Sequence, residues 1–293
     1  MTLDVLDGDA RTETVASRIR SAMDRLSAKE RQVARVVLAQ YPAAGLETTT
    51  ALSSLAKVSG PTVIRFVSRL GYRSYREFQT ALRDELVAKT ASPLTKSAPS
   101  AAQTATGEFR ATAAGLFAEG VRRTLAEIPD AEFDRAVALL ADQDARVHIL
   151  GGRFTRLAAE YFAIHLQALR PGCHIHPDAR AAATVTPDLR RRDCVVAFDF
   201  RRYQADTIAL VRLARARRAS VVLITDPWMS PIAEMADVVL TAKVDAVSAF
   251  DSHVCTVALV ETLIGALQGR LRDTFPSRMR ELEQIRASLE PQA

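Results

Sequence analysis

The chain has 293 residues and a mass of 32.0 kDa, with 48% hydrophobic and 25% charged residues. This length suits two globular domains, and the composition excludes a mostly disordered or collagen-like protein. The formal net charge is only +5, so the location of the charge matters more than its sum. The three cysteines form no CxxC pair, and the first ten residues lack the apolar segment of a signal peptide. We expect a cytoplasmic protein without a membrane helix.

Helical patterns fill the first part of the chain. Ser27 is followed three residues later by Glu30, which predicts a capping box and a helix that ends near Pro42. A short helix is expected over Thr49–Leu55, and after a turn a second helix over Ser59–Leu70. Two short helices separated by a tight turn are typical of a helix-turn-helix.

The segment from Thr48 to Arg76 contains no acidic residue and five basic ones, as expected of a DNA-binding surface. Ser59 as N-cap, with Pro61 just inside, would place the helix N-terminus against a phosphate. Thr62 and Arg65 are predicted to face outward toward base edges. The alternative is a solvated basic face on a small helical domain. The predicted DNA-contacting residues are Lys57, Ser59, Pro61, Thr62, Arg65, Arg69 and Arg73.

The sequence TASPLTKSAPSAAQTAT, from Thr90 to Thr106, is rich in small and polar residues and predicts a linker. It divides the chain into a helical domain over residues 14–89, a linker over 90–107 and a second domain over 108–293.

Short apolar runs and longer amphipathic segments alternate after the linker. Helices are predicted over Glu108–Ile128, Asp130–Ala141, Arg156–Leu169, Ala205–Arg217 and Phe250–Leu271. Strands are predicted over Val147–Leu150, Cys173–His176, Cys194–Phe198, Ser220–Thr225 and Val238–Ala242. This alternation predicts an α/β domain with a five-stranded, doubly wound parallel sheet behind an all-α N-terminal domain.

Polar residues follow the first and third predicted strands. Gly151 and Gly152 open a helix after the first, with Arg153 beside them, and Asp199 begins a polar loop after the third. Such loops meet at the carboxyl edge of a parallel sheet, where ligands bind. The arginines there are expected to repel one another unless an anion binds. The alternative is that Arg153 pairs with a surface carboxylate and that residues 199–204 cap a helix and hold a salt bridge. The predicted effector-binding residues are Gly152, Arg153, Thr155, Asp199, Arg201, Arg202, Tyr203 and Ser252.

The stretch LSSLAKVSGPTVIRFVSRLGYRSYREFQTAL, from Leu52 to Leu82, resembles the helix-turn-helix of the MurR/RpiR family of bacterial transcription regulators. The matching residues are Val58-Ser59, Thr62-Val63, Arg65-Phe66, Leu70-Gly71-Tyr72, Tyr75 and Phe78. Lys57 stands where the family usually has the glycine of the turn.

Residues 131–271 resemble the sugar isomerase (SIS) domain that follows the helix-turn-helix in this family. The family's phosphosugar loop, Ser-x-Ser-Gly-x-Thr, is replaced here by residues 199–204, and Arg153 replaces a second glycine. The larger side chains and the Asp199 carboxylate disfavour an ordinary sugar phosphate. A carboxylate or a differently seated phosphate remains compatible with the arginines.

Three functions compete on these residues: a ligand-responsive transcription regulator, a sugar-phosphate isomerase with an accessory domain, and a nucleic-acid binder without ligand control. The regulator is preferred because it explains both domains and the linker, and because the isomerase loop has lost its phosphate seat. The expected partners are double-stranded operator DNA, a small anionic effector and further copies of the chain, in a homodimer or homotetramer. No catalytic residue, metal or cofactor is predicted. Cys173, His174 and His176 are interpreted as strand residues rather than metal ligands.

Overall fold

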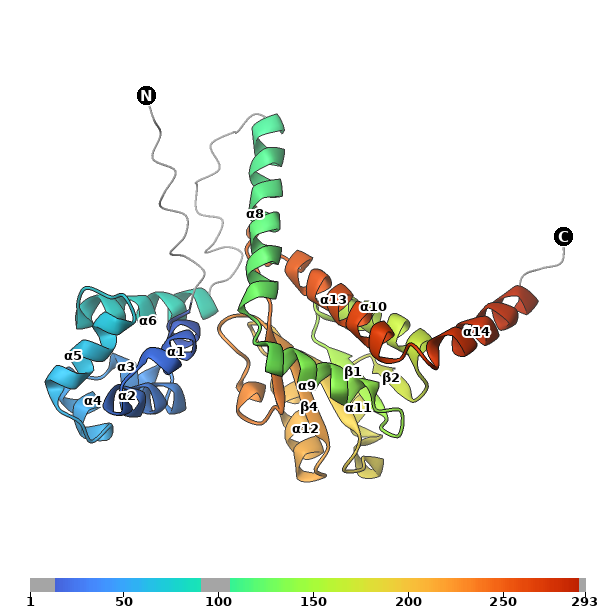
Figure 1. Cartoon of the computed structure of the whole chain (residues 1–293), viewed down its shortest axis with the longest axis horizontal. Helices are drawn as coiled ribbons and strands as arrows, with labels where there is room; N and C mark the ends of the chain where they lie inside the picture. The colour runs from blue at the N-terminus through green and yellow to red at the C-terminus, as the bar shows by residue number, and fades with distance from the viewer. Residues whose placement is uncertain (1–13, 91–105, 290–293) are drawn as a thin grey trace. The chain divides into compact units, whose positions relative to one another are not determined.

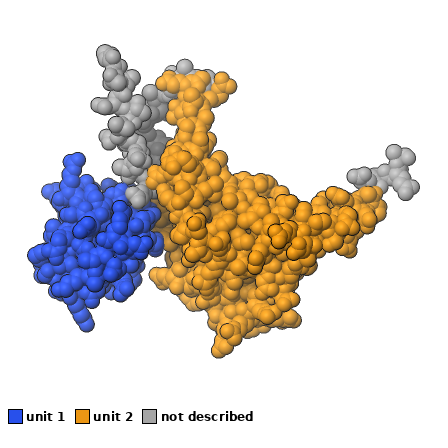
Figure 2. All heavy atoms as spheres, viewed as in Figure 1, with its two compact units in different colours: residues 1–96 blue, residues 97–293 orange. Residues whose placement is uncertain are grey.

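The computed structural model describes residues 14–90 and 106–289. The chain divides into two compact units, residues 1–96 and 97–293, which Figure 2 colours separately. Most of the predicted linker lies outside the described residues, whereas Thr90 and Thr106 belong to helices. The domain boundaries therefore stay a prediction, and each unit is described by itself.

Unit 1 is entirely helical where it is described. Its elements are α1 Val15–Ala22, η1 Met23–Arg25, α2 Ala28–Ala39, α3 Ala43–Leu46, α4 Thr49–Leu55, α5 Gly60–Arg69 and α6 Tyr75–Thr90. The predicted capping box of Ser27 and Glu30 is present at the start of α2. The core is built around Phe78, whose ring contacts Phe66 and Tyr72 edge-to-face at 6.3 and 5.6 Å between centroids.

The turn between α4 and α5 contains Lys57 in the left-handed region, at φ 51°. A glycine adopts this conformation without steric cost, which explains why the family usually places one there. Gly71 follows α5 with φ +88°, a left-handed conformation that favours glycine after a helix end.

Unit 2 contains one parallel sheet and the helices around it (Figure 1). The strands are β1 Val147–Gly151, β2 Cys173–His176, β3 Cys194–Phe198, β4 Ser220–Thr225 and β5 Val238–Thr241, in the order β2-β1-β3-β4-β5. The helices are α8 Thr106–Glu127, α9 Asp130–Ala141, α10 Arg156–Leu169, α11 Ala179–Ala183, η2 Thr186–Asp188, α12 Ala205–Ala216, η3 Pro231–Glu234, α13 Val254–Arg270 and α14 Phe275–Leu289. The predicted fold class is confirmed.

Helices cover both faces of the sheet, because its strands are apolar on both sides. Helices α9, α10 and α13 pack over one face, and α8 lies against α13; α11 and α12 pack over the other. The chain runs outward from β1 in both directions, so the switch point lies between β1 and β3. Within residues 14–90 and 106–289 no single helix is long and apolar enough to cross a membrane. The bent pair α13 and α14 together has the required length and apolar composition.

The final helix of the sheet domain begins later than predicted. Helix α13 starts at Val254 rather than Phe250, since the preceding backbone is used elsewhere: Ser252 N–H donates to the carbonyl of Val244 at 3.0 Å. Helices α11 and α14 were not predicted. The first is very short, and the second has no fully buried residue.

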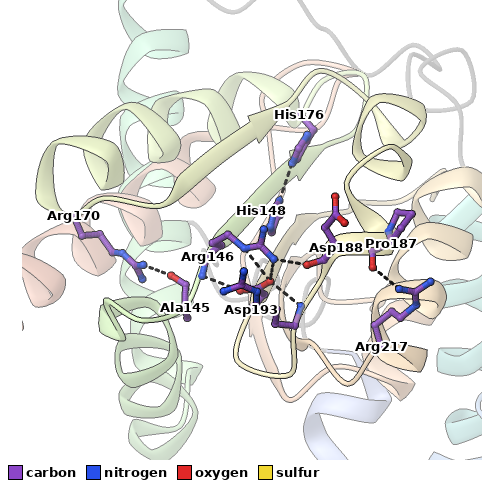
Figure 3. A network of polar contacts seen from close by, with 10 residues as sticks. Ala145, Arg146, His148, Arg170, His176, Pro187, Asp188, Asp193 and Arg217 are labelled. Carbon is purple, nitrogen blue, oxygen red and sulfur yellow. Dashed lines mark hydrogen bonds and ion pairs between the residues drawn. The ribbon is translucent and has the colours of Figure 1, made fainter.

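A polar network fixes the amino-terminal ends of β1 and β3 (Figure 3). The Arg146 guanidinium and backbone N–H both donate to the buried Asp193 carboxylate, at 2.6–3.1 Å. Arg170 is buried and donates to the carbonyls of Leu140 and Ala145, ahead of β1. These contacts tie together segments that are far apart in the sequence.

Three histidines stack on one side of β1 and β2 (Figure 3 labels two of them). His148 Nδ1 lies 3.0 Å from His176 Nε2, and the His148 ring is 5.3 Å from the rings of both His174 and His176. In the part of the chain that the structure describes, these histidines and every other group of His, Cys, Asp and Glu side chains lack an arrangement of three that could hold a metal ion. Burial, reinforced by the neighbouring imidazoles, lowers the pKa of His148 to about 4.

This lowered pKa predicts an acid-sensitive stability of unit 2. An unfolded histidine takes up a proton near pH 6.5, whereas folded His148 resists it down to about 4, so the unfolded state binds more protons in between. The contribution of His148 to the free energy of unfolding should therefore fall as the pH decreases through that window, so the free energy of unfolding of wild type should fall relative to that of His148→Gln. Urea denaturation followed by the fluorescence of Trp228, the single tryptophan, measures it. His165→Gln is the control and should keep the wild-type slope; an unchanged slope in His148→Gln would contradict the assignment.

Candidate functional site

Helix α5 buries one face and exposes the other. Val63, Phe66 and Val67 enter the core of unit 1, whereas Arg65 and Arg69 are exposed, as predicted. The further exposed residues of the outer face and its surroundings are Lys57, Ser59, Pro61, Ile64, Ser68, Arg73 and Arg76. The helix therefore presents a basic surface that a polyanion can approach.

The prediction that Thr62 faces outward is wrong. Thr62 is 2% exposed. Its hydroxyl lies 3.0 Å from the Ser59 hydroxyl and accepts from Arg65 Nη2 at 3.1 Å. Position 62 lies at the border of the two faces, and both α2 and α4 pack against α5. Thr62 thus holds Arg65 in place instead of facing solvent.

Ser59 occupies the N-cap position of α5, as predicted, but its side chain makes no capping bond to a backbone N–H. Its hydroxyl is instead paired with Thr62. At this end of α5, Pro61 has no N–H, and the Thr62 N–H donates to the Ser59 carbonyl at 2.9 Å.

The loops after β1 and β3 are joined by hydrogen bonds at the switch point. Gly151 is in register with Phe198. The Thr155 hydroxyl donates to the Phe198 carbonyl at 2.8 Å and accepts from the Gly152 N–H at 2.7 Å. A side chain at Gly152 would place its Cβ 2.8 Å from Gln204 Oε1, so glycine permits this close approach. The predicted convergence of the two loops is confirmed.

Asp199 is buried at the end of β3. The Ser230 hydroxyl and, at 3.4 Å, the Gln204 N–H donate to its carboxylate, and Thr225 donates to its carbonyl. Burial raises the pKa of Asp199 to about 6. The carboxylate therefore organises the loop from inside.

The prediction of an arginine cluster that only an anion can neutralise is wrong for Arg201. Its side chain is 3% exposed and forms a bidentate pair with Asp251, with Nε donating to Oδ2 at 2.5 Å. Its guanidinium also lies over the Trp228 ring, 4.6 Å from the centroid. The partner is fifty residues away in the sequence, in the loop before α13, so local pattern reasoning could not find it.

Asp226 was missed by sequence reasoning, although it directly follows β4 just as Asp199 follows β3. It is buried and accepts from the Tyr203 hydroxyl and the Trp228 N–H, each at 2.9 Å, and from the Arg201 N–H. Burial raises its pKa. Asp226 therefore fixes the backbone of the loop that Asp199 begins.

The remaining predicted residues differ in exposure. Arg153 and Arg202 are exposed, and Arg153 lies 5.3 Å from the centre of the Phe154 ring. Ser252 is half-buried, and its hydroxyl accepts from the Val254 N–H at 3.2 Å, at the start of α13. The edge of the sheet thus combines a fixed polar interior with two exposed guanidinium groups.

Residues 13–89 match the helix-turn-helix domain of the rpiR family, and residues 139–266 match the SIS domain. The chain belongs to the RpiR family of transcription regulators. A regulator of this helix-turn-helix type from Providencia stuartii, itself uncharacterised, is 23% identical over 228 residues, which are 78% of this chain and 79% of that protein.

Two solved structures share this fold. The NanR protein of Vibrio vulnificus, in complex with ManNAc-6P, is 21% identical, with a TM-score of 0.55 over 94% of this chain and 99% of that chain. The sugar isomerase domain of an RpiR transcription factor from Sphaerobacter thermophilus is 23% identical, with a TM-score of 0.56 over 60% of this chain and 98% of that chain. At these identities the likeness shows the fold.

Removal of the Asp251 carboxylate should destabilise unit 2. Asp251→Asn removes the carboxylate that pairs with the buried Arg201 guanidinium, which should lower the free energy of unfolding by about 3 kcal/mol. Urea denaturation followed by Trp228 fluorescence measures the loss. Asp273→Asn is the matched control, because that side chain is 91% exposed and should change stability by less than about 0.5 kcal/mol. Equal stability of both variants would contradict the role of the pair.

Proposed function

We propose that this RpiR-family regulator binds operator DNA through the outer face of α5 and a small anionic metabolite at the β1–β3 edge, without catalysing a reaction. The observation that carries the proposal is the row of exposed basic residues on and around α5, in a segment (residues 48–76) without Asp or Glu, in a chain that also has a SIS sheet with polar loops at its switch point. The first part supplies DNA affinity, and the second supplies a place for a signal.

The contacts to DNA divide into two kinds. Lys57, Arg69 and Arg73 are suited to phosphates, which gives affinity for any sequence, while the N-terminus of α5 at Ser59 and Pro61 can receive a further phosphate. Arg65 is suited to a guanine edge in the major groove, where arginine is the commonest specific contact. Thr62 supports recognition through its hydrogen bond to Arg65.

Arg65→Ala should weaken operator binding by about 1–3 kcal/mol and random-DNA binding much less. Thr62→Val should lose part of the same specificity, because the hydroxyl no longer holds Arg65, and Thr62→Ser should restore it. Arg73→Ala should instead weaken both DNAs alike and reduce the salt slope by about one. Fluorescence anisotropy on both duplexes at several salt concentrations measures these effects.

The double variant separates positioning from direct contact. If Thr62 acts through Arg65, then Thr62→Val combined with Arg65→Ala should bind no more weakly than Arg65→Ala alone. Additive losses would contradict that role, and equal losses on operator and random DNA would contradict the assignment of α5 to recognition.

The proposed effector is a small anionic metabolite, sugar-phosphate-like or a carboxylate. Arg153, which follows Gly152 in the chain, and Arg202, on the loop after β3, are exposed and are assigned to its charge. Thr155, Asp199, Arg201 and Tyr203 are assigned to holding the loops, and Ser252 to the start of α13. The ManNAc-6P bound to NanR supports a phosphorylated sugar derivative as the first class to test.

Arg153→Ala and Arg202→Ala should each weaken effector binding at least about tenfold, since each loses a charge-assisted hydrogen bond. A panel of sugar phosphates and carboxylates is screened by thermal shift, and isothermal titration measures the affinity for each hit. Arg272→Ala is the control, on an exposed arginine beside α14. Unchanged affinity in both test variants would place the ligand elsewhere, and conversion of a hit to an isomer would favour the isomerase.

We also propose that the chain self-associates. Leu157 and Ile164 on α10 and Val257 on α13 are exposed apolar side chains, and burial against a second copy would remove them from water. A homodimer or homotetramer presents two α5 helices to two half-sites. Light scattering should give at least twice the 32.0 kDa of one chain; the mass of one chain would contradict it.

A further inference from the structure

Ile64 is an apolar side chain that helix α5 does not use in its core. Among the residues of α5, all of which the structure describes, its exposed fraction of 44% contrasts with at most 1% for Val63, Phe66 and Val67. A single exposed aliphatic side chain is common on protein surfaces and has no meaning by itself. Its neighbours give it one.

The outer face of α5 places Ile64 beside the candidate base-reading arginine. At 3.6 residues per turn, Pro61 and Ser68 lie in the middle of this face, with Ile64 on one side and Arg65 on the other. All four residues are exposed or outward-facing. Because Arg65 is held by Thr62, the outer face presents a fixed hydrogen-bond donor at one edge and an apolar side chain at the other.

The charges around this face limit what can cover Ile64. The exposed basic residues in and next to the turn and helix are Lys57, Arg65, Arg69, Arg73 and Arg76. The cores of protein–protein interfaces are depleted in charge, whereas a basic surface is suited to nucleic acid. The apolar group that DNA offers in its major groove is the C5-methyl of thymine.

We propose that Ile64 contacts the C5-methyl group of a thymine in each operator half-site, next to the base that Arg65 contacts. This inference rests on the proposed operator binding through α5. It makes Ile64 a determinant of sequence specificity that acts by apolar contact, whereas Arg65 acts by hydrogen bonds. Each half-site should then contain one thymine whose methyl group matters.

The test removes only that methyl group. The operator is first obtained by selection of random duplexes on the full chain, and each thymine is then replaced singly by deoxyuridine. Wild type should lose about three- to tenfold in affinity at one thymine per half-site, as expected for burial of one methyl against an aliphatic side chain. Ile64→Ala should bind the thymine and uracil operators equally. Leu55→Ala, at another exposed aliphatic residue of unit 1, on α4, should retain the wild-type discrimination.

The outcomes separate this inference from the proposed function. Failure of wild type to select any sequence overturns both. Selection of an operator that depends on Arg65 but on no thymine methyl overturns the inference alone, as does discrimination that persists in Ile64→Ala. Circular dichroism and the urea midpoint of Ile64→Ala should equal those of wild type, because the side chain is exposed and alanine favours the helix.

Discussion

The parallel pairing of β1 with β3 places the chain after Gly151 beside the chain after Phe198. The two segments are joined by Thr155, whose hydroxyl bonds both the Gly152 N–H and the Phe198 carbonyl. Further contacts attach later loops to this junction. The Ser230 hydroxyl, from beyond β4, donates to the Asp199 carboxylate, and Arg201 donates to the carboxylate of Asp251, which precedes α13. The strand order therefore brings these loops together at the carboxyl edge of the sheet, and their hydrogen bonds fix them relative to one another.

This arrangement gives a physical route from a bound ligand to the helices of unit 2. Arg202 is exposed on the loop whose neighbour Arg201 is paired with Asp251, and Asp251 lies just before α13. Helix α13 packs against α10 and α8, and α8 is the first described helix after the linker. We propose that an anion that attracts Arg202 shifts this loop and with it the start of α13. Coupling of this kind requires that the ligand bind two states of the unit with different affinity.

Much of the fold could be predicted from the sequence. Strands Cys173–His176, Cys194–Phe198 and Ser220–Thr225 have the predicted bounds, because buried parallel strands are short apolar runs between turn signals. Helix Thr49–Leu55 also has its predicted bounds. The bounds of these elements are set by residues close together in the sequence, and hydrophobic periodicity reports on such local patterns.

The candidate site was less predictable, because its geometry depends on partners that are distant in the sequence. Arg201 and Arg202 are adjacent and of the same type, yet one is buried against Asp251 and the other is exposed. Thr62 lies at the border of the two faces of α5, where a helical wheel cannot assign its exposure, and the folded unit buries it. Local patterns indicated which loops meet. Only the assembled sheet shows which side chains of those loops are paired with other residues of the protein and which are exposed.

The central claim is that occupation of the β1–β3 edge changes the affinity of α5 for DNA. The most direct measurement is the dissociation constant of the full chain for its operator, by fluorescence anisotropy, with and without a saturating metabolite that binds unit 2. The account predicts a change of at least about fivefold, and an equal change in metabolite affinity when operator is saturating, as thermodynamic linkage requires. An operator affinity that is the same with and without bound metabolite would contradict it.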